Sequence, residues 1–230
     1  MYLAAVHSNF LILPSRALAR FGNEKPWLIQ PIRQTPIVFL DLETTGLTPG
    51  LEDVIEIAAY RYQNGQVIDR FATLVKPNKR ISEEIEQITK ISNAMVQNSP
   101  TQSDALSQLS AFIQPTDVLA GDFIDFDLAH LKTKLPALGL SPEWLNRSRQ
   151  EVICTRTLEQ RLKRLGLKSF LDELKASLPE RPRHRAENDV KNSADLLYGI
   201  FAAPQPIFQN LVSVQDYLTL QEEAFLYQGR

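Results

Sequence analysis

The sequence predicts an α/β fold in which a mixed β-sheet is flanked by helices. Two observations lead to this prediction. First, three apolar runs have the composition of strands, and a hairpin signal joins the second run to the third. Second, helical patterns then alternate with two short apolar runs that fit short parallel strands. Together they predict an antiparallel three-strand meander that is extended by short parallel strands.

The meander is expected in three runs of apolar, partly β-branched residues. The second run is followed by Asn64-Gly65, a dipeptide that strongly favours a hairpin turn. The third run returns from that turn and stops at Pro77. The three runs are PIVFLDLETTG (36–46), VIEIAAYRY (54–62) and VIDRFATLVKP (67–77).

Helical patterns dominate the rest of the chain. Ser103 is a candidate N-cap, Pro136 is expected to stop a helix, and Ser169 has the spacing of a capping box with Asp172. Helices are expected at 82–90, 103–113, 125–135, 155–165, 169–178 and 186–203, and short strands at 117–121 and 151–155.

Composition limits the size and the surroundings of this domain. The 230 residues are 43% hydrophobic, which is enough for one sizeable domain. The net charge of −2 argues against a broad basic surface, so any nucleic-acid contact should be local. The single cysteine, Cys154, indicates a reducing compartment, and we expect a cytoplasmic protein. No apolar run is long enough to span a membrane, and the N-terminus lacks the basic region of a signal peptide.

Three parts of the chain can be separated. Residues 1–34 form an N-terminal extension, residues 35–203 form the main domain, and residues 204–230 form a tail that begins at a proline-marked linker. The tail contains a helical pattern over 214–227, for which two interpretations stay open. It either packs back on the domain or contacts a partner protein.

Two acidic residues, Asp41 and Glu43, stand at the end of the first predicted strand. Successive side chains of a strand point to opposite faces, so these carboxylates share one face. They repel each other and are costly to bury unpaired, and a divalent cation such as Mg²⁺ would relieve that cost. The alternative is a pair of solvated acids followed by an ordinary Thr-Thr-Gly turn.

Two further acids, Asp127 and Asp189, lie in the first turns of predicted helices. The helix dipole favours acids there, which is a purely structural explanation. If both helix starts pack near the end of the first strand, four carboxylates converge. His184 precedes Asp189 in an arginine-rich loop, from which it could swing over a metal site. His130 lies within a predicted helix and is interpreted as structural.

Three motifs together resemble the DEDD exonuclease superfamily, the RNase H-like group that contains the proofreading exonucleases. FLDLETTG resembles its first signature, and FIDFDLAHL is similar to its middle signature, with Phe126-Asp127 in the Phe-Asp position. HRAEND resembles the His-x-Ala-x-x-Asp signature of the DEDDh branch, as in DNA polymerase III epsilon subunit-like exonucleases. The resemblance covers about 36–203. It departs at Asp122-Phe123, where the family usually carries His-Asn.

The resemblance implies an RNase H-like fold and a 3′–5′ exonuclease that releases nucleoside 5′-monophosphates. It implies two divalent ions, Mg²⁺ or Mn²⁺, with Asp41 as a bridging ligand and Glu43 also positioning the terminal 3′-OH. His184 would be the general base that deprotonates the attacking water. The implied metal ligands are Asp41, Glu43, Asp127 and Asp189, and the implied substrate-binding residues are Thr44, Thr45, Gly46 and Leu47.

The partner that the resemblance implies is a nucleic acid with a free 3′ end. Single-stranded DNA is the first hypothesis, and an exoribonuclease acting on RNA ends or oligoribonucleotides is the second, since contacts to the 2′-OH decide between them. A hypothesis of another class is a non-catalytic nucleic-acid-binding or polymerase-assembly module. The presence of all four acids and His184 argues against it. The arginines around His184 either meet the phosphate backbone or form a solvated loop, and the tail could contact a polymerase or repair partner.

Overall fold

The sheet of the computed structural model has five strands in the order β3-β2-β1-β4-β5. The structure describes residues 30–147, 151–204, 208 and 211–226. The first three strands pair antiparallel, and β4 and β5 are added parallel to β1. The predicted mixed sheet is therefore confirmed. The strands are β1 (Ile37–Thr44), β2 (Val54–Gln63), β3 (Gln66–Leu74), β4 (Val118–Gly121) and β5 (Val152–Cys154).

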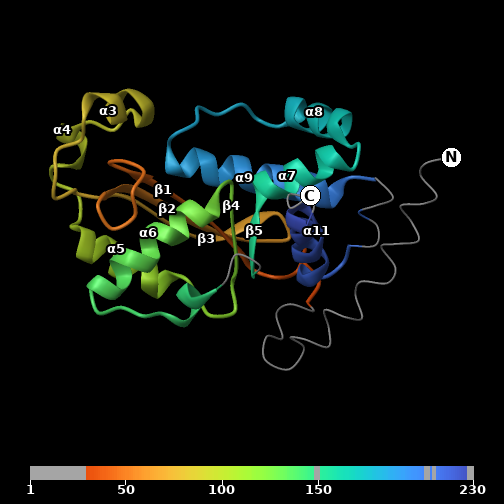
Figure 1. The fold of residues 1–230 in the computed structure, drawn as a ribbon, viewed down its shortest axis with the longest axis horizontal. Helices are drawn as coiled ribbons and strands as arrows, with labels where there is room; N and C mark the ends of the chain where they lie inside the picture. Colours follow the sequence, from red (N-terminus) through yellow and green to blue (C-terminus); the bar gives the residue numbers. More distant parts are fainter. Residues whose placement is uncertain (1–29, 148–150, 205–207, 209–210, 227–230) are drawn as a thin grey trace.

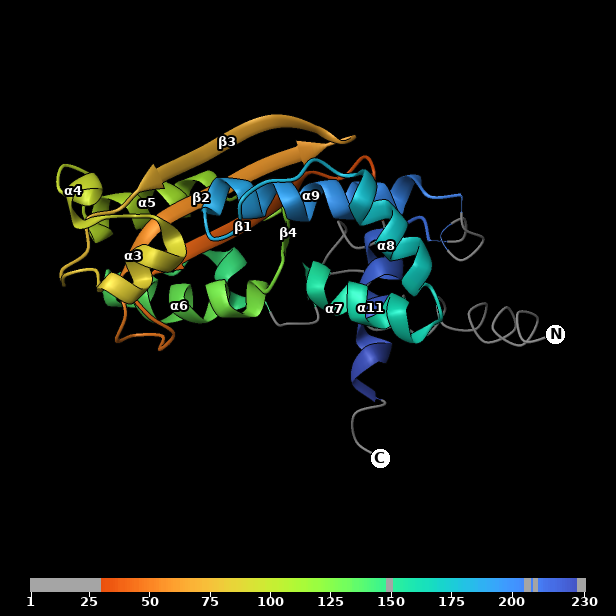
Figure 2. The same ribbon diagram turned by 90° about the horizontal axis from the view of Figure 1, so that it is seen from above.

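Helices cover both faces of the sheet, as Figures 1 and 2 show. On one face α9 lies along β1 and β2, with α7, α8 and α11 beside it, and on the other face α5 and α6 pack. The helices are α3 (Glu83–Thr89), α4 (Asn93–Val96), α5 (Gln102–Phe112), α6 (Ile124–Ala137), α7 (Thr155–Arg164), α8 (Lys168–Ser177), α9 (Ala186–Ala202) and α11 (Val214–Leu226), with a 3₁₀ turn at Glu143–Asn146.

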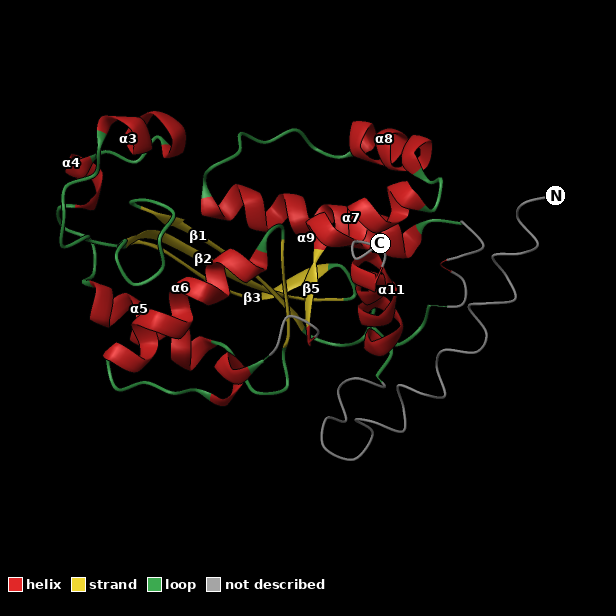
Figure 3. Ribbon diagram, viewed as in Figure 1, coloured by secondary structure: helices red, strands yellow, loops and turns green. Residues whose placement is uncertain are grey.

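The strand β1 is the centre of this arrangement. Ile37 and Phe39 point into the core beneath α9, while Val38 and Leu40 point into the core beneath α6. All four side chains are buried, as expected for a strand that is covered on both faces. Figure 3 shows the sheet enclosed between the two helical layers. Any side chain near the end of β1 is therefore held by a rigid element.

Several predicted helix ends are wrong, and a local hydrogen bond explains the first difference. Thr101, and not Ser103, is the N-cap of α5, because its side chain accepts a hydrogen bond from the N–H of Asp104. The helix α8 begins at Lys168, so Ser169 does not cap it. The helix α6 runs past Pro136, since only its last turn loses a hydrogen bond there. It ends at Ala137, and Gly139, two residues later, has a φ of 74°.

The described parts of the two terminal segments pack against the main domain. Ile32 is buried, and its N–H donates a hydrogen bond of 2.8 Å to the carbonyl of Val212. Tyr217 and Leu218 of α11 are buried in the core beneath α9. The position of α11 thus agrees with the interpretation in which the tail packs back on the domain. The boundaries 34/35 and 203/204 stay a prediction, and residues 1–29, 205–207, 209–210 and 227–230 lie outside the described residues.

A side chain of α11 forms hydrogen bonds with the free edge of strand β5. Gln221 is buried, and its amide nitrogen donates to the carbonyl of Val152 at 2.9 Å. Its amide oxygen accepts from the N–H of Cys154 at 2.8 Å. One side chain therefore satisfies the backbone groups that an edge strand leaves unpaired. In the described ranges, no helix has both the length and the apolar character needed to cross a membrane.

Candidate active site

Three predicted site residues, Asp41, Glu43 and Asp189, lie together at the end of β1. One carboxylate oxygen of each lies within 4.8 Å of the others. The first two stand on the face of β1 that α9 covers, and α9 carries Asp189 in its first turn. The proximity follows from the fold, because the start of α9 packs over the end of the central strand.

The fourth predicted acid, Asp127, arrives from the opposite helical layer. It lies in the first turn of α6 and is buried, with 4% of its surface exposed. Its Oδ1 accepts a hydrogen bond of 2.8 Å from the backbone N–H of Leu42. This bond ties α6 to β1 between the two acids of the strand. The charge of Asp127 acts on the carboxyls of Asp41 and Glu43, so all four acids belong to one electrostatic unit.

Burial and mutual repulsion make this unit a strong candidate for a cation site. Burial, followed by the charges of Asp127 and Glu43, raises the pKa of Asp41 well above its ordinary value. Burial and the charge of Asp189 raise the pKa of Glu43 to about 8. Burial also raises the pKa of Asp127 to about 8, although the N–H of Leu42 opposes it. Carboxylate oxygens are the ligands that Mg²⁺ and similar hard cations prefer, so the donor set fits divalent metal ions.

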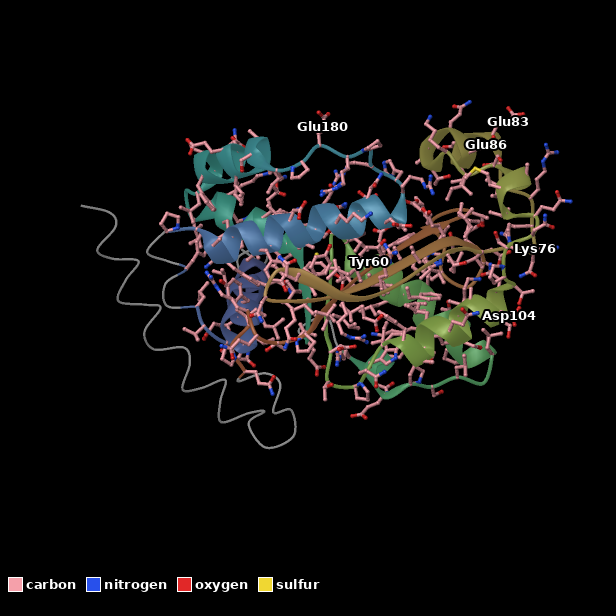
Figure 4. All side chains as sticks on the ribbon, turned by 180° about the vertical axis from the view of Figure 1, so that it is seen from behind. Tyr60, Lys76, Glu83, Glu86, Asp104 and Glu180 are labelled. Carbon is pink, nitrogen blue, oxygen red and sulfur yellow. The ribbon has the colours of Figure 1, made fainter. Side chains whose placement is uncertain are left out.

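His184 stands at the rim of the acid cluster. Its side chain is exposed, and its backbone N–H donates a 2.7 Å hydrogen bond to Oδ2 of Asp189. Its φ of 61° is in the left-handed region, which is uncommon for a residue other than glycine. The residue lies in the segment 178–185 between α8 and α9, from which Glu180 points outward in Figure 4. The backbone of His184 is therefore held beside Asp189, while its side chain is exposed.

The three arginines around His184 differ in how firmly they are held. Arg181 pairs with Asp195 on α9 at 2.6 Å. Arg183 is 65% exposed and spans Asp122 at 3.3 Å and Asp189 at 3.9 Å. Of the three side chains, that of Arg183 is the most exposed.

The third arginine, Arg185, is anchored by a buried acid that the sequence reading missed. Its guanidinium donates a 2.8 Å hydrogen bond to Glu56 of β2, and the N–H of Ala186 donates to the other carboxylate oxygen at 2.8 Å. Glu56 is 4% exposed. Its signal in the sequence is a lone acid inside the apolar run VIEIAAY.

The segment after Glu43 is a compact loop whose hydroxyls are used internally. Thr44 donates to the carbonyl of Gly46 at 2.6 Å, and Thr45 donates to the carboxylate of Glu52 at 2.6 Å. A Cβ on Gly46 would lie 2.9 Å from the Glu52 side chain, so the loop is tightly closed there. Leu47 is 83% exposed, which excludes a core position for it.

Comparison with known proteins identifies relatives of this arrangement. The model of the RNase_T family, described as exonuclease, matches residues 38–197. The PolC-type DNA polymerase III of Caldanaerobacter subterraneus subsp. tengcongensis is 30% identical over 186 residues, which cover 81% of this chain and 13% of that protein. The PolC-type enzyme of Thermotoga maritima is 32% identical over 163 residues, covering 69% of this chain and 11% of that protein. The chain thus spans only a small part of these relatives.

Solved structures of exonucleases share the fold. Escherichia coli exonuclease I in complex with a dA16 oligonucleotide matches with a TM-score of 0.62 and 17% identity, covering 77% of this chain and 43% of that one. Exonuclease X in complex with 5′ overhanging duplex DNA matches with a TM-score of 0.54 and 21% identity, covering 80% of this chain and 99% of that one. At these identities the likeness establishes the architecture alone.

Proposed function

Because the chain belongs to the RNase_T exonuclease family, we propose that it is a metal-dependent 3′–5′ exonuclease acting on single-stranded DNA. It would hydrolyse the terminal phosphodiester bond and release nucleoside 5′-monophosphates. The observation that carries the proposal is the cluster of Asp41, Glu43 and Asp189 at the end of a rigid central strand. Burial and mutual repulsion raise the pKa of Asp41 and Glu43, as expected for acids that await a cation.

Two divalent ions, Mg²⁺ or Mn²⁺, would be held by Asp41, Glu43, Asp127 and Asp189. The chemistry that such ions supply when bound is activation of a water and stabilisation of the charge on the phosphate and the leaving oxygen. We assign Asp41 as the ligand that would be shared by both ions, and the charges of the other three acids all act on it. Glu43 would also orient the terminal 3′-OH. The hydrogen bond from Leu42 keeps Asp127 oriented toward β1.

His184 would act as the general base. An imidazole nitrogen that carries no proton can accept one from the attacking water. The backbone hydrogen bond to Asp189 keeps the residue at the rim. The pair of Arg185 with Glu56 fixes the chain on the C-terminal side of the histidine. Only the side chain then has to rotate toward the substrate.

The loop of Thr44, Thr45, Gly46 and Leu47 would receive the terminal nucleotide. Because both threonine hydroxyls have partners within the loop, the contacts to the nucleotide would come from the backbone. Leu47, with 83% of its surface exposed, would pack against the terminal base.

DNA is proposed over RNA because the relatives are named DNA polymerases and the similar structures are complexes with DNA. An exoribonuclease is the second candidate, since the acid cluster serves either backbone. A non-catalytic binding or assembly module has less support, because all the acids of the cluster and His184 are present. The single cysteine supports a reducing, cytoplasmic setting.

The names of the relatives also support a polymerase or repair partner. A contact through the tail would have to use surface other than Tyr217 and Leu218, because both are buried. This partner proposal can be tested by asking whether Val212→Asp, at a residue of the tail that is 58% exposed, abolishes co-purification of a polymerase while Val67→Asp, on the exposed strand β3, does not.

The test of the function is an assay with 5′-labelled DNA and RNA strands of one sequence, with Mg²⁺, with Mn²⁺ and with EDTA. We expect a ladder that shortens from the 3′ end, that EDTA abolishes and that is faster on DNA. Asp189→Asn should abolish it, whereas Asp195→Asn, on the same helix, should not. No cleavage by folded wild-type protein, or full activity of Asp189→Asn, would overturn the proposal.

A further inference from the structure

An exposed aromatic ring, that of Phe123, stands beside the acid cluster. Its residue is 44% exposed and is the N-cap of α6, the helix that carries Asp127. The preceding strand end lies against β1, since a Cβ on Gly121 would be 2.7 Å from the carbonyl oxygen of Leu40. The neighbouring charge of Asp122 acts on the carboxyls of Asp41 and Asp127. Phe123 therefore belongs to the rim of the site and not to a remote surface.

This ring is supported from one side by a cation. The guanidinium of Arg156 lies 4.9 Å from the ring centroid. Arg156 is itself held by Asp122, through a side-chain ion pair of 2.7 Å and a bond of 3.2 Å from its backbone N–H to the Asp122 carbonyl. The guanidinium thus restrains one side of the ring before any ligand arrives, and a restrained side chain loses less entropy on binding.

The surroundings favour an anionic ligand with a flat apolar part. Arg183 pairs with the same Asp122 carboxylate and keeps 65% of its side chain exposed. One guanidinium group therefore lies over an exposed ring, and a second pairs with the neighbouring Asp122 at the edge of the acid cluster. A nucleotide unit matches both features, since its phosphate is attracted by cations and its base stacks on aromatic rings.

We propose that Phe123, backed by Arg156, is a stacking platform for one nucleobase of the substrate strand near its 3′ end. This inference rests on the proposed function and adds a base-binding residue to it. Stacking tolerates any base, because every base has a π-face. The platform would hold the strand in register with the acid cluster while successive nucleotides are removed.

The first test measures affinity without cleavage. Binding of a fluorescent single-stranded DNA in EDTA is compared for wild-type protein, Phe123→Ala, Phe123→Tyr and Leu138→Ala. We expect Phe123→Ala to weaken binding by roughly 5- to 100-fold and Phe123→Tyr to restore it, because stacking is lost and regained. Leu138 is 38% exposed at the other end of α6, so its variant should bind as wild-type does. Equal affinity of all four proteins would overturn the platform.

The second test locates the stacked base with strands that each carry one abasic residue at a different distance from the 3′ end. At one position the abasic residue should weaken binding to wild-type protein by as much as Phe123→Ala weakens binding to the intact strand. At that same position the abasic residue should cause no further loss in Phe123→Ala. If the fold-losses caused by the abasic residue and by Phe123→Ala multiply at every position, the two act independently, and stacking on Phe123 is contradicted. A wild-type protein that passes both binding tests but does not cleave DNA would overturn the proposed function and leave the platform standing.

Discussion

Two glutamates of the same strand pair, Glu43 and Glu56, have opposite environments. They face each other in the register of β1 and β2, and both are nearly buried. Glu56 is neutralised by Arg185 and by the N–H of Ala186. Among the described residues, no hydrogen bond or ion pair to the carboxylate of Glu43 is formed, and its pKa is raised to about 8. The protein therefore bonds one acid with its own groups, and under the proposed function a cation from solution would compensate the other.

The largest effect is expected where the uncompensated acid is removed. Glu43→Gln should lower kcat by about 10³-fold or more, since metal-assisted charge stabilisation contributes several kcal/mol. The same variant should not lower the free energy of unfolding of the metal-free protein, because it removes a buried acid that repels its neighbours. Single-turnover rates and chemical denaturation measure the two quantities. A variant that unfolds more easily and keeps its activity would reverse the roles of the two glutamates.

The next effect links metal binding to pH. Glu43 and Asp127 have ordinary pKa values of 4.5 and 3.8, and in the folded metal-free protein both are raised to about 8. Between these limits the folded state holds protons that the unfolded chain has released, so the stability of the metal-free protein falls as the pH rises from about 4 to about 8. Mg²⁺ must displace these protons and should therefore bind more tightly above pH 8 than at pH 6.

Thermal denaturation with and without Mg²⁺ at the two pH values measures this linkage. At a Mg²⁺ concentration of about 100 Kd, bound metal should raise the free energy of unfolding by about 2.7 kcal/mol. Glu43→Gln should lose most of the gain, whereas Glu83→Gln, on the exposed surface of α3, should keep it. A metal-induced stabilisation that is equal at both pH values would contradict the raised pKa of these carboxyls.

The compensated acid should show the reverse pattern. Glu56→Gln breaks a pair whose acid is buried and whose Arg185 side chain is 36% exposed. Removing one partner of a buried pair costs 3–5 kcal/mol, and the exposure of Arg185 lowers this to about 2 kcal/mol. Urea denaturation measures the loss. Because Arg185 also fixes the loop of His184, kcat should fall while the affinity for Mg²⁺ is unchanged, and a lowered metal affinity would make Glu56 part of the metal site.

The smallest effect is expected at the second arginine of that loop. Arg183 forms longer ion pairs than Arg185 and is far more exposed, so Arg183→Gln should change the free energy of unfolding by less than about 0.5 kcal/mol. If it contacts a phosphate, its removal should reduce the slope of log K against log salt by about 0.7 for single-stranded DNA. Titrations at several salt concentrations measure the slope. An unchanged slope would mean a solvated arginine.

The acids of the site could be predicted from the sequence because they lie beside strong local patterns. Asp41 and Glu43 lie at the end of an apolar strand, and Asp127 and Asp189 lie in the first turns of helices. The partner of Glu56 is Arg185, 129 residues later, and no local pattern specifies such a pairing. The hydrogen bonds of Gln221 to β5 could not be predicted for the same reason.

Helix ends were less predictable than helices because several polar residues compete for each cap. Thr101 and Ser103 are both good caps, and the choice depends on how α5 packs against β2. For α11 the sequence allows both interpretations, since an apolar helical face can contact either the core or a partner. The burial of Ile32 against the carbonyl of Val212 could not be derived from either segment alone.

The position of β1 between β2 and β4 has a consequence for amide hydrogen exchange. Backbone groups of Val38 and Phe39 are bonded on both edges and buried, so their protons should exchange only when the whole domain unfolds. The edge strand β3 is exposed along Gln66–Arg70 and should exchange through local opening. The two acids of β1 would stay in place through every partial opening, while Asp189 could leave them whenever the first turn of α9 frays. Deuterium uptake at that turn would then report how often the intact domain disassembles its own acid cluster.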